Sequence, residues 1–368
     1  MQQPPHILVA PLDWGLGHAT RCIPIIHALL QAGCRVSLAA DGAPARLLQE
    51  AFPQLTMHPL PGYGIHFGKG NVLRSLLQQV PAILKAIRTE HDWLQHMQST
   101  HAFDAVISDN RYGLYHAACH SILITHQLQP AMPKGWGWLQ ALARKFFYQR
   151  IEKFTACWVP DEANTTAALS GILGHPLVMP RIPVHYVGWL SRMQAQPEEA
   201  KAYEVMILLS GPEPQRSMLE NRLLQQLQHF HRKAILVRGL PEANADLSVH
   251  LPHVTVYHHL PAAALQTAML QSGCIICRGG YSTLMDAYTL RKKCLLIPTP
   301  GQTEQEYLAQ TLAAKHQAIC FAQEDFDLSD ALQQAETFNW QVLPQPQASE
   351  CLQVFVSNWV KETFSTGH

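Results

Sequence analysis

Residues 274–310 constrain the fold of this chain more than any other stretch, because apolar runs alternate there with turns and helix starts. The run 274–277 has the length and composition of a strand buried on both faces, and the Arg-Gly-Gly sequence at 278–280 breaks that pattern. A helix is predicted from about Ser282, followed by a second apolar strand at 294–297, a turn and another helix. This alternation indicates a parallel α/β sheet covered by helices.

The same stretch carries residue types that suit a phosphorylated ligand. Its two helix N-termini are predicted at the carboxyl edge of the sheet, where α/β folds bind ligands. The first offers backbone N–H groups and hydroxyls with no acidic residue before Asp286, which favours a phosphate, and Gly279 and Gly280 let the backbone approach an anion closely. Asp286 is expected to accept bonds from a ribose diol, and the cluster 304–306 (Glu-Gln-Glu) to bind sugar hydroxyls.

These residues resemble the donor-binding signature of the GT-B glycosyltransferases that use UDP-sugars. That family includes the bacterial enzyme that adds N-acetylglucosamine to lipid-linked muropeptide, and plant secondary-metabolite transferases. Residues 279–283 match its glycine-rich phosphate turn, and Asp286 stands where the family has a ribose-binding glutamate. Pro298, the pair at 304–305 and Ala309 match the rest of the motif, with leucine at 308 in place of the usual asparagine.

A second motif lies near the start of the chain, after a predicted strand at 6–11. Residues 15–18 (Gly-Leu-Gly-His) are not a dinucleotide fingerprint, because no third glycine follows at the required spacing. Residues 15–21 are similar to the amino-terminal loop of the same GT-B enzymes, in which glycines and a histidine face the donor. With Arg21 and Cys22 the loop also resembles the Gly-x-Gly-His-x-x-Arg-Cys loop of nucleotide-sugar hydrolases. We therefore expect His18 to be the catalytic base. The alternative is that His18 only makes local hydrogen bonds at the start of the helix predicted from about 19 to 31.

Candidate acceptor residues come from a glycine-rich loop at 61–71 and from the ends of two strands. This loop is long for a plain connection, and in the family the corresponding region faces the acceptor. Strands at 105–108 and 121–124 deliver Asp109 and His126 to the carboxyl edge. Either residue is expected to orient His18 or to bind the acceptor, and Asp109 is the preferred partner of His18. The alternative for each residue is a purely structural role. The predicted acceptor-binding residues are Tyr63, His66, Asn71 and His126.

The resemblance implies two Rossmann-like domains facing each other across a cleft. A length of 368 residues with 47% apolar and 15% charged residues suits two domains. We predict an acceptor domain at 1–190, a donor domain at 202–345 and a C-terminal helix at 346–368, with the polar segment between the domains as linker. The predicted donor-binding residues are Gly17, Ser210, Gly211, His259, Gly279, Gly280, Ser282, Thr283, Asp286, Glu304, Gln305 and Glu306.

Composition argues against several other classes of function. The formal net charge is zero, which does not point to nucleic acid. The nine cysteines are scattered in apolar contexts, and the paired histidines at 258–259 lack a third ligand, so no metal or cofactor is expected beyond the nucleotide-sugar co-substrate. The Asp-x-Asp sequence at 325–327 fits a helix cap better than a metal site. No signal peptide and no run of about 18 apolar residues is visible, which favours the cytoplasm.

One helical segment, residues 134–154, suggests contact with a membrane surface. It contains Trp136 and Trp138 and has five Lys or Arg against one Glu, which suits an anionic membrane at its inner face. A helix that packs on the core with a solvated basic side fits equally well.

The implied reaction is inverting, metal-independent transfer of a sugar from a nucleotide, most naturally UDP, to a hydroxyl of a lipid-linked or glycan acceptor. Two alternatives stay open: a hydrolase that uses water as acceptor, as the Arg21-Cys22 match suggests, and a non-catalytic nucleotide-sugar-binding protein.

Overall fold

The structure, a computed structural model, describes most of the chain and divides it into two compact units. It covers residues 3–63, 72–132, 135–197, 199–240, 251–342 and 350–364, with the backbone alone at 72–79, 350 and 351. Of these, the first unit comprises residues 3–63, 77–192 and 350–364, and the second comprises residues 72–76 and 193–342.

The first unit is built on a seven-stranded sheet in which every neighbouring pair of strands is parallel. In spatial order the strands are β3 (Thr56–Pro59), β2 (Arg35–Ala40), β1 (His6–Pro11), β4 (Ala105–Asp109), β5 (His120–Ile124), β6 (Ala156–Val159) and β7 (Val184–Tyr186). Its helices are α1 (Leu16–Gln31), α2 (Gly42–Ala51), α3 (Val72–His101), α4 (Gln140–Ile151) and α10 (Glu350–Phe364), with short 3-10 turns at Gly137–Leu139 and Gly171–Leu173.

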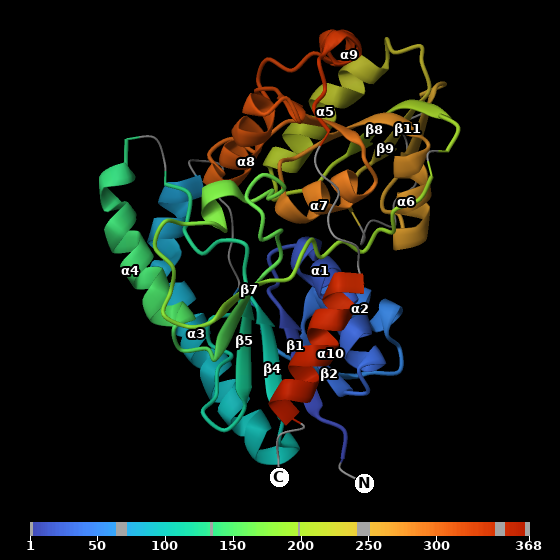
Figure 1. Ribbon diagram of the computed structural model, residues 1–368. Coiled ribbons are helices and arrows are strands. Elements are labelled where there is room, and N and C mark those ends of the chain that lie inside the picture. The colour runs from blue at the N-terminus through green and yellow to red at the C-terminus, as the bar shows by residue number, and fades with distance from the viewer. Residues whose placement is uncertain are drawn as a thin grey trace. The chain divides into compact units, whose positions relative to one another are not determined.

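Both faces of this sheet are covered, as the apolar run of β1 requires. All six residues of β1 are buried. Alternate side chains point to opposite faces, so Ile7 packs in a cluster with residues of α1, α2 and α10, whereas Leu8 packs in a cluster that includes Leu94 of α3. Figure 1 shows α10 lying along this unit although it ends the chain. There Trp158 of β6 meets the rings of Phe355 and Trp359 of α10, each at 5.1 Å between centroids.

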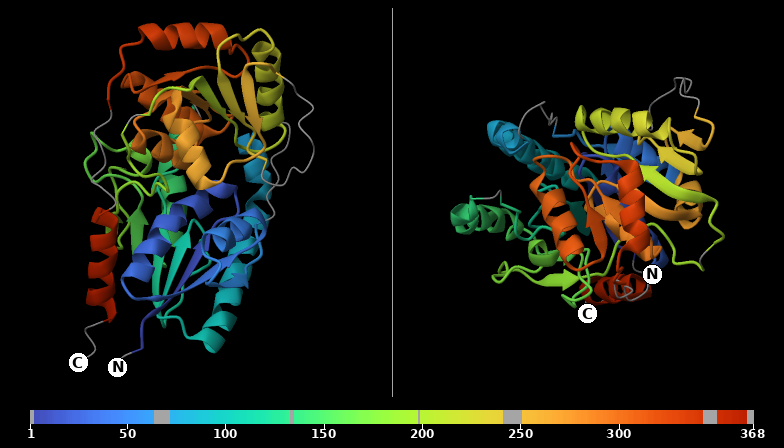
Figure 2. Two further views of the ribbon diagram at one scale, coloured as in Figure 1. Left: turned by 90° about the vertical axis from the view of Figure 1, so that its right-hand side faces the viewer. Right: turned by 90° about the horizontal axis from the view of Figure 1, so that it is seen from above.

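The second unit repeats the plan with a six-stranded parallel sheet. Its spatial order is β10 (Val254–Tyr257), β9 (Ala234–Val237), β8 (Tyr203–Leu208), β11 (Ser272–Cys277), β12 (Lys293–Leu296) and β13 (Ala318–Cys320). The helices are α5 (Gln215–Leu227), α6 (Ala262–Leu270), α7 (Tyr281–Thr289), α8 (Thr303–Ala314) and α9 (Leu328–Thr337). Figure 2 gives two further views of these elements.

Strand order places a ligand-binding edge in each unit. In the first sheet β1 lies between β2 and β4, and in the second β8 lies between β9 and β11. The chain therefore winds outward in opposite directions from β1 and from β8. At such switch points the loops after neighbouring strands diverge and leave a crevice at the carboxyl ends. The motif of residues 15–21 follows β1, and the glycine turn of residues 278–280 follows β11.

The strand, turn and helix order predicted for 274–310 is confirmed, with α7 beginning at Tyr281. The start predicted for the first helix is wrong: α1 begins at Leu16 rather than near residue 19. Gly15 adopts φ 86°, a conformation that favours glycine, and this lets the helix begin directly after it. Gly17 and His18 thus lie in the first helical turn. The cap predicted at 325–327 is confirmed, because the Asp327 side chain accepts the Asp330 N–H and begins α9.

Candidate active site

The first cluster of candidate residues lies where β1 and β4 end, around the buried carboxylate of Asp109. His18 stands in the first turn of α1, and Asp109 is the last residue of β4. His18 Nδ1 lies 3.2 Å from Asp109 Oδ1. The His18 side chain is 16% exposed, whereas Asp109 is fully buried. The structure thus brings together the two residues that the sequence suggested as a catalytic pair.

A third member of this cluster, Arg21, was not expected from the sequence. Arg21 lies one turn after His18 on α1 and is 1% exposed. Its Nε donates to Asp109 Oδ2 at 2.5 Å, and its Nη2 donates to Asp109 Oδ1. Nη2 also lies 2.8 Å from His18 Nδ1, and Nη1 lies 3.1 Å from Nδ1 of the buried His126. The available signal was the i, i+3 spacing of His18 and Arg21, which puts both side chains on one face of a helix.

Burial and charge set the protonation of this cluster. Burial by itself raises the pKa of Asp109, but the Arg21 guanidinium and His18 outweigh it and lower that pKa to about 2. Burial and the nearby Arg21 lower the pKa of His18, although Asp109 opposes the shift. The positive end of the α1 dipole acts in the same direction on a ring in the first turn. His18 is therefore a neutral imidazole at neutral pH.

Of the predicted acceptor residues, Tyr63 lies in a buried network. Tyr63 is 8% exposed, and its hydroxyl donates to Glu90 Oε2 at 2.8 Å. Arg111, which is fully buried, donates to Glu90 Oε1 and to the carbonyl of Pro11. The Tyr63 hydroxyl is thus held inside the unit by the buried carboxylate of Glu90, and acceptor binding by this residue stays a prediction. The other two loop candidates, His66 and Asn71, lie outside the described residues.

The second cluster surrounds the glycine turn between β11 and α7. Gly280 is the N-cap of α7, and its Cβ position is open, with nothing within 4 Å. A Cβ on Gly279 would instead meet the Gln305 carbonyl oxygen at 2.9 Å. Ser282 and Thr283, both half-buried, occupy the first turn, which has no acidic residue. The turn is thus a helix N-terminus with free space beside its cap, which is the arrangement that binds anions.

A buried cation, Arg278, precedes this turn and was not singled out from the sequence. Arg278 is 1% exposed, and its guanidinium donates to the carbonyls of Ile297 at 3.0 Å and Gln215 at 2.8 Å. Within the described residues no carboxylate pairs with it, and its Nε has no partner. Burial lowers the pKa of Arg278 to about 10, so the group is still charged at neutral pH. An uncompensated buried cation is costly, and a bound anion nearby would offset that cost.

Other predicted donor residues lie on elements that reach the same edge. Asp286, 7% exposed, is one turn into α7. In α8, Gln305 Oε1 accepts the Thr299 N–H and Glu306 Oε1 accepts the Gly301 N–H, each at 2.8 Å. Gln305 and Glu306 therefore each use one oxygen to brace the turn after β12. Further members of the predicted set are half-buried or exposed in loops after β8 and β10 or in α8: Ser210, Gly211, His259 and Glu304.

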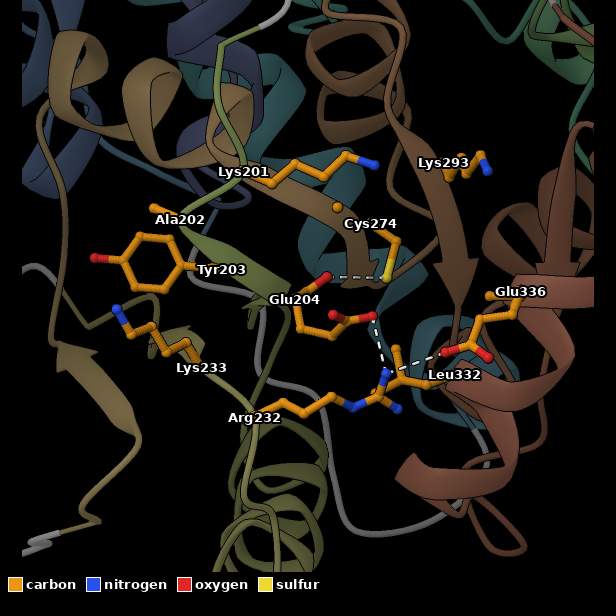
Figure 3. A pocket seen from close by; sticks show the side chains of 12 residues that line it. Lys201, Ala202, Tyr203, Glu204, Arg232, Lys233, Cys274, Lys293, Leu332 and Glu336 are labelled. Atoms are coloured by element: carbon orange, nitrogen blue, oxygen red, sulfur yellow. Dashed lines mark hydrogen bonds and ion pairs between the residues drawn. The ribbon is translucent and has the colours of Figure 1, made fainter.

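A cavity of about 480 Å³ in the second unit lies at the opposite, amino edge of the sheet. Figure 3 shows its lining near the starts of β8, β11 and β12. Its central guanidinium, Arg232, pairs with Glu204 at 3.1 Å and Glu336 at 3.0 Å. Three lysines, Lys201, Lys233 and Lys293, also line the cavity, and it holds none of the predicted donor residues.

The described residues include neither a cluster of metal ligands nor a helix that could span a membrane. Among them no group of three or more His, Cys, Asp or Glu side chains is arranged to hold a metal ion. In the same part of the chain, no helix is long and apolar enough to cross a membrane. Cys274 and Cys277 are buried free thiols of β11.

Comparison with known proteins relates this architecture to glycosyltransferases. Residues 217–358 match the glycosyltransferase family 28 C-terminal domain. A search of curated proteins by sequence finds no match. Among solved structures, the glycotransferase of kitacinnamycin is similar with a TM-score of 0.66 at 14% identity, covering 99% of this chain and 100% of that chain.

Two further structures come from a bacterium and a plant. MurG of Acinetobacter baumannii has a TM-score of 0.52 at 16% identity, with 98% of this chain and 100% of that chain covered. UGT2 of Phytolacca americana, solved with UDP-2-fluoro-glucose and pterostilbene, has a TM-score of 0.58 at 11% identity, with 99% and 96% covered. These likenesses show the GT-B fold, which is the fold that the motifs indicated, and the domain match is to a glycosyltransferase domain.

Proposed function

We propose that the chain, which has the GT-B fold and matches a glycosyltransferase domain over residues 217–358, transfers a sugar from a UDP-sugar to a hydroxyl acceptor with inversion and without a metal ion. The observation that carries the proposal is the open N-terminus of α7 after the Gly279–Gly280 turn, at the carboxyl end of β11. Such an N-terminus binds a diphosphate through backbone N–H groups and the helix dipole. The plant relative solved with a UDP-sugar analogue supports a uridine diphosphate as the leaving group.

In the proposed reaction His18 is the general base. Its Nε2 accepts the proton of the acceptor hydroxyl while the acceptor oxygen forms a bond to the anomeric carbon. The bond from that carbon to the diphosphate oxygen breaks, and UDP leaves with the electron pair. A single displacement of this kind inverts the anomeric carbon. In the tautomer that acts as a base, His18 Nδ1 carries the proton and donates it to Asp109 Oδ1, which leaves the lone pair on Nε2. Arg21 Nη2, whose N–H groups can only donate, then bonds to Asp109 Oδ1 rather than to the ring.

Stabilisation of the leaving diphosphate is assigned to protein groups. The first-turn amides of α7 face it, and the uncompensated charge of Arg278 lies directly before the turn. Both act on the negative charge that develops as the bond breaks, in a place already organised for it. This pair of contributions supports a mechanism without a cation. Asp286 is proposed to bind the ribose, and Glu304, Gln305 and Glu306 the sugar.

The roles of the remaining donor and acceptor residues are proposed from their location in the fold. Gly17, Ser210, Gly211 and His259 follow strands β1, β8 and β10 at carboxyl edges and are assigned to the donor. His126, bonded to Arg21 and buried, is assigned to the acceptor side. Ser282 and Thr283 offer hydroxyls to the diphosphate from the first turn of α7.

Contact with a membrane surface is proposed for the 3-10 turn at Gly137–Leu139 and α4, which would suit a lipid-linked acceptor. Trp138 is 78% exposed and Leu142 65% exposed, and Trp136 and Phe146 are also exposed. The Tyr148 hydroxyl donates to the Val178 carbonyl, which holds the exposed apolar segment 177–179 beside α4. Lys145 on the same helix adds positive charge. Exposed aromatic rings with neighbouring cations suit the interface of an anionic bilayer.

Calorimetry with UDP, followed by a UDP-release assay with and without an acceptor extract, tests the proposed function. Transfer predicts UDP binding, and UDP release that depends on the extract. Release of free sugar at the same rate without extract would identify a hydrolase. Tight UDP binding with no release under either condition would identify a non-catalytic binder, and absence of any nucleotide binding would remove the donor site.

A further inference from the structure

Arg21 makes a more extensive set of contacts than an ordinary ion pair. Its planar guanidinium donates two hydrogen bonds to Asp109 and also lies against Nδ1 of both His18 and His126. A side chain that is 1% exposed and bonded on three sides has one available orientation. It therefore fixes three other groups that come from α1, from the end of β4 and from the loop after β5.

The position of His18 Nδ1 between a carboxylate and a guanidinium has a chemical consequence. Asp109 Oδ1 is 3.2 Å away and favours a protonated ring, whereas Arg21 Nη2 is 2.8 Å away and disfavours one. Within the first unit, the titratable and charged groups that act on the ring are Arg21 from α1, Asp109 from β4 and His126 after β5, and Cys22 of α1 contacts Asp109 rather than the ring. Arg21 is the one permanent cation among them, and it stands closest.

A general base must be unprotonated before it acts. A buried carboxylate alone beside His18 would favour the imidazolium, which has no lone pair to accept a proton. Because Arg21 donates to Asp109 and places its positive charge beside the ring, Nδ1 can donate its single proton to the carboxylate while Nε2 stays unprotonated.

We infer that Arg21 is a positioning residue for sugar transfer, which fixes Asp109 and keeps the His18 imidazole neutral at the pH of the reaction. The inference rests on the proposed role of His18 as base. It assigns Arg21 two separable properties, the fork geometry that orients Asp109 and the positive charge that keeps His18 unprotonated.

The test is an NMR titration of His18 in the free protein, with the resonance assigned from its loss in His18→Gln, together with the pH profile of kcat/KM. The wild-type His18 pKa is expected below 6.5. Arg21→Met should move that pKa, and the acid limb of the profile, to higher pH. Arg21→Lys keeps the charge without the fork, so kcat should fall while the His18 pKa stays low.

Arg111→Lys is the matched control, because Arg111 is equally buried but bonds to Glu90 rather than to His18. It should leave the His18 pKa unchanged. That result would show that disturbing a buried arginine elsewhere in the unit does not by itself shift the pKa of His18. If Arg21→Met does not fold, Asp109→Asn serves instead, since an uncompensated Arg21 should lower the His18 pKa further.

A wild-type His18 pKa of 6.5 or higher would overturn the inference, as would a pKa that does not respond to Arg21→Met or to Asp109→Asn. Its failure is distinguishable from failure of the proposed base. If His18→Ala retains turnover, the base assignment fails whatever the titration shows. If His18→Ala is inactive but the His18 pKa does not change in Arg21→Met, only the inference about Arg21 fails.

Discussion

At the residue scale, the two units treat a buried arginine in opposite ways. Arg21 is bidentate with Asp109, so the pair carries no net charge. Arg278 has only carbonyl partners among the described residues, so its charge stays available to a ligand. A neutralised pair organises a base, whereas an uncompensated cation attracts an anion. The two arginines thus suit the two chemical tasks of sugar transfer, removing a proton and holding a diphosphate.

His18→Ala and Asp286→Ala should separate catalysis from donor binding. His18→Ala removes the base and should lower turnover by about 10²–10⁴-fold with little change in UDP affinity. Asp286→Ala removes one or two charge-assisted hydrogen bonds to the ribose and should cost about 1.5–3 kcal/mol each in UDP binding. Calorimetry with UDP and steady-state kinetics on both variants give the comparison. A folded Asp286→Ala protein that binds UDP like wild type would take this residue out of the donor site.

Acid should weaken the first unit through Asp109. Its pKa is lowered from 3.8 to about 2, because Arg21 and His18 outweigh burial, which alone would raise it. A lowered carboxyl pKa stabilises the folded state above pH 3.8, and that contribution is lost as the pH falls through about 2. The gap corresponds to about 2 kcal/mol.

Thermal unfolding of wild type and Asp109→Asn between pH 5 and pH 2 tests this contribution. The difference in midpoint between the two proteins should shrink as the pH falls. A difference that stays constant over this range would show that Asp109 is not ionised in the folded protein, or that its ionisation does not stabilise the fold.

At the scale of elements, the glycine turn before α7 combines two different requirements for glycine. Gly279 lacks a side chain because the Gln305 carbonyl of α8 stands 2.9 Å from its Cβ position. Gly280 has φ −72°, which any residue adopts, and open space beside it. Packing of α8 therefore accounts for the first glycine, and the open space beside the second fits the proposed approach of a ligand.

The substitutions Gly279→Ala and Gly280→Ala should accordingly differ. Gly279→Ala forces α8 away from the turn and should lower the melting temperature. Gly280→Ala should leave the melting temperature near that of wild type and weaken UDP binding, because its methyl group fills the space beside the helix N-terminus. Thermal shift without and with UDP measures both effects. Equal losses of stability in the two variants would contradict this division.

The 3-10 turn at Gly137–Leu139 and α4 carry the prediction for membranes. Wild-type protein should co-sediment with anionic liposomes, less so at high salt, because exposed tryptophans and nearby cations act together. The double variant Trp136→Ala/Trp138→Ala should sediment less. Val354→Ala, at an exposed apolar position of α10, is the matched control and should sediment like wild type. Unchanged sedimentation of the double variant would remove this surface from the proposal.

Sequence patterns were most informative where local chemistry decides the structure. The buried strands, the glycine turn and the Asp327 cap follow from periodicity and from residues that only certain backbone conformations accept. Arg21 and Tyr63 were not foreseeable in the same way, because their partners lie 88 and 27 residues away in sequence. Such pairings depend on which strands become neighbours, and the spacing of residues along the chain does not specify that.

At the scale of the whole molecule, α10 returns to the unit in which the chain begins. Leu352 and Val356 of α10 join the cluster that contains Ile25 of α1, and Trp158 of β6 meets Phe355. Most of the second unit, residues 193–342 of the described chain, is therefore inserted between α10 and the rest of the first unit. The C-terminal helix predicted from sequence is confirmed as a helix, and its packing site is a feature that only the structure gives.

This connectivity has a consequence for biosynthesis. A ribosome makes the chain from its amino end, so all seven strands of the first sheet emerge long before α10 does. Until α10 leaves the exit tunnel, the side chains of α1 and the ring of Trp158 lack the apolar cover that α10 gives them. The second unit, whose six strands and helices α5 to α9 follow one another in sequence, can finish folding first. The unit translated first is thus the one completed last, and a nascent chain arrested before α10 presents an apolar surface to chaperones.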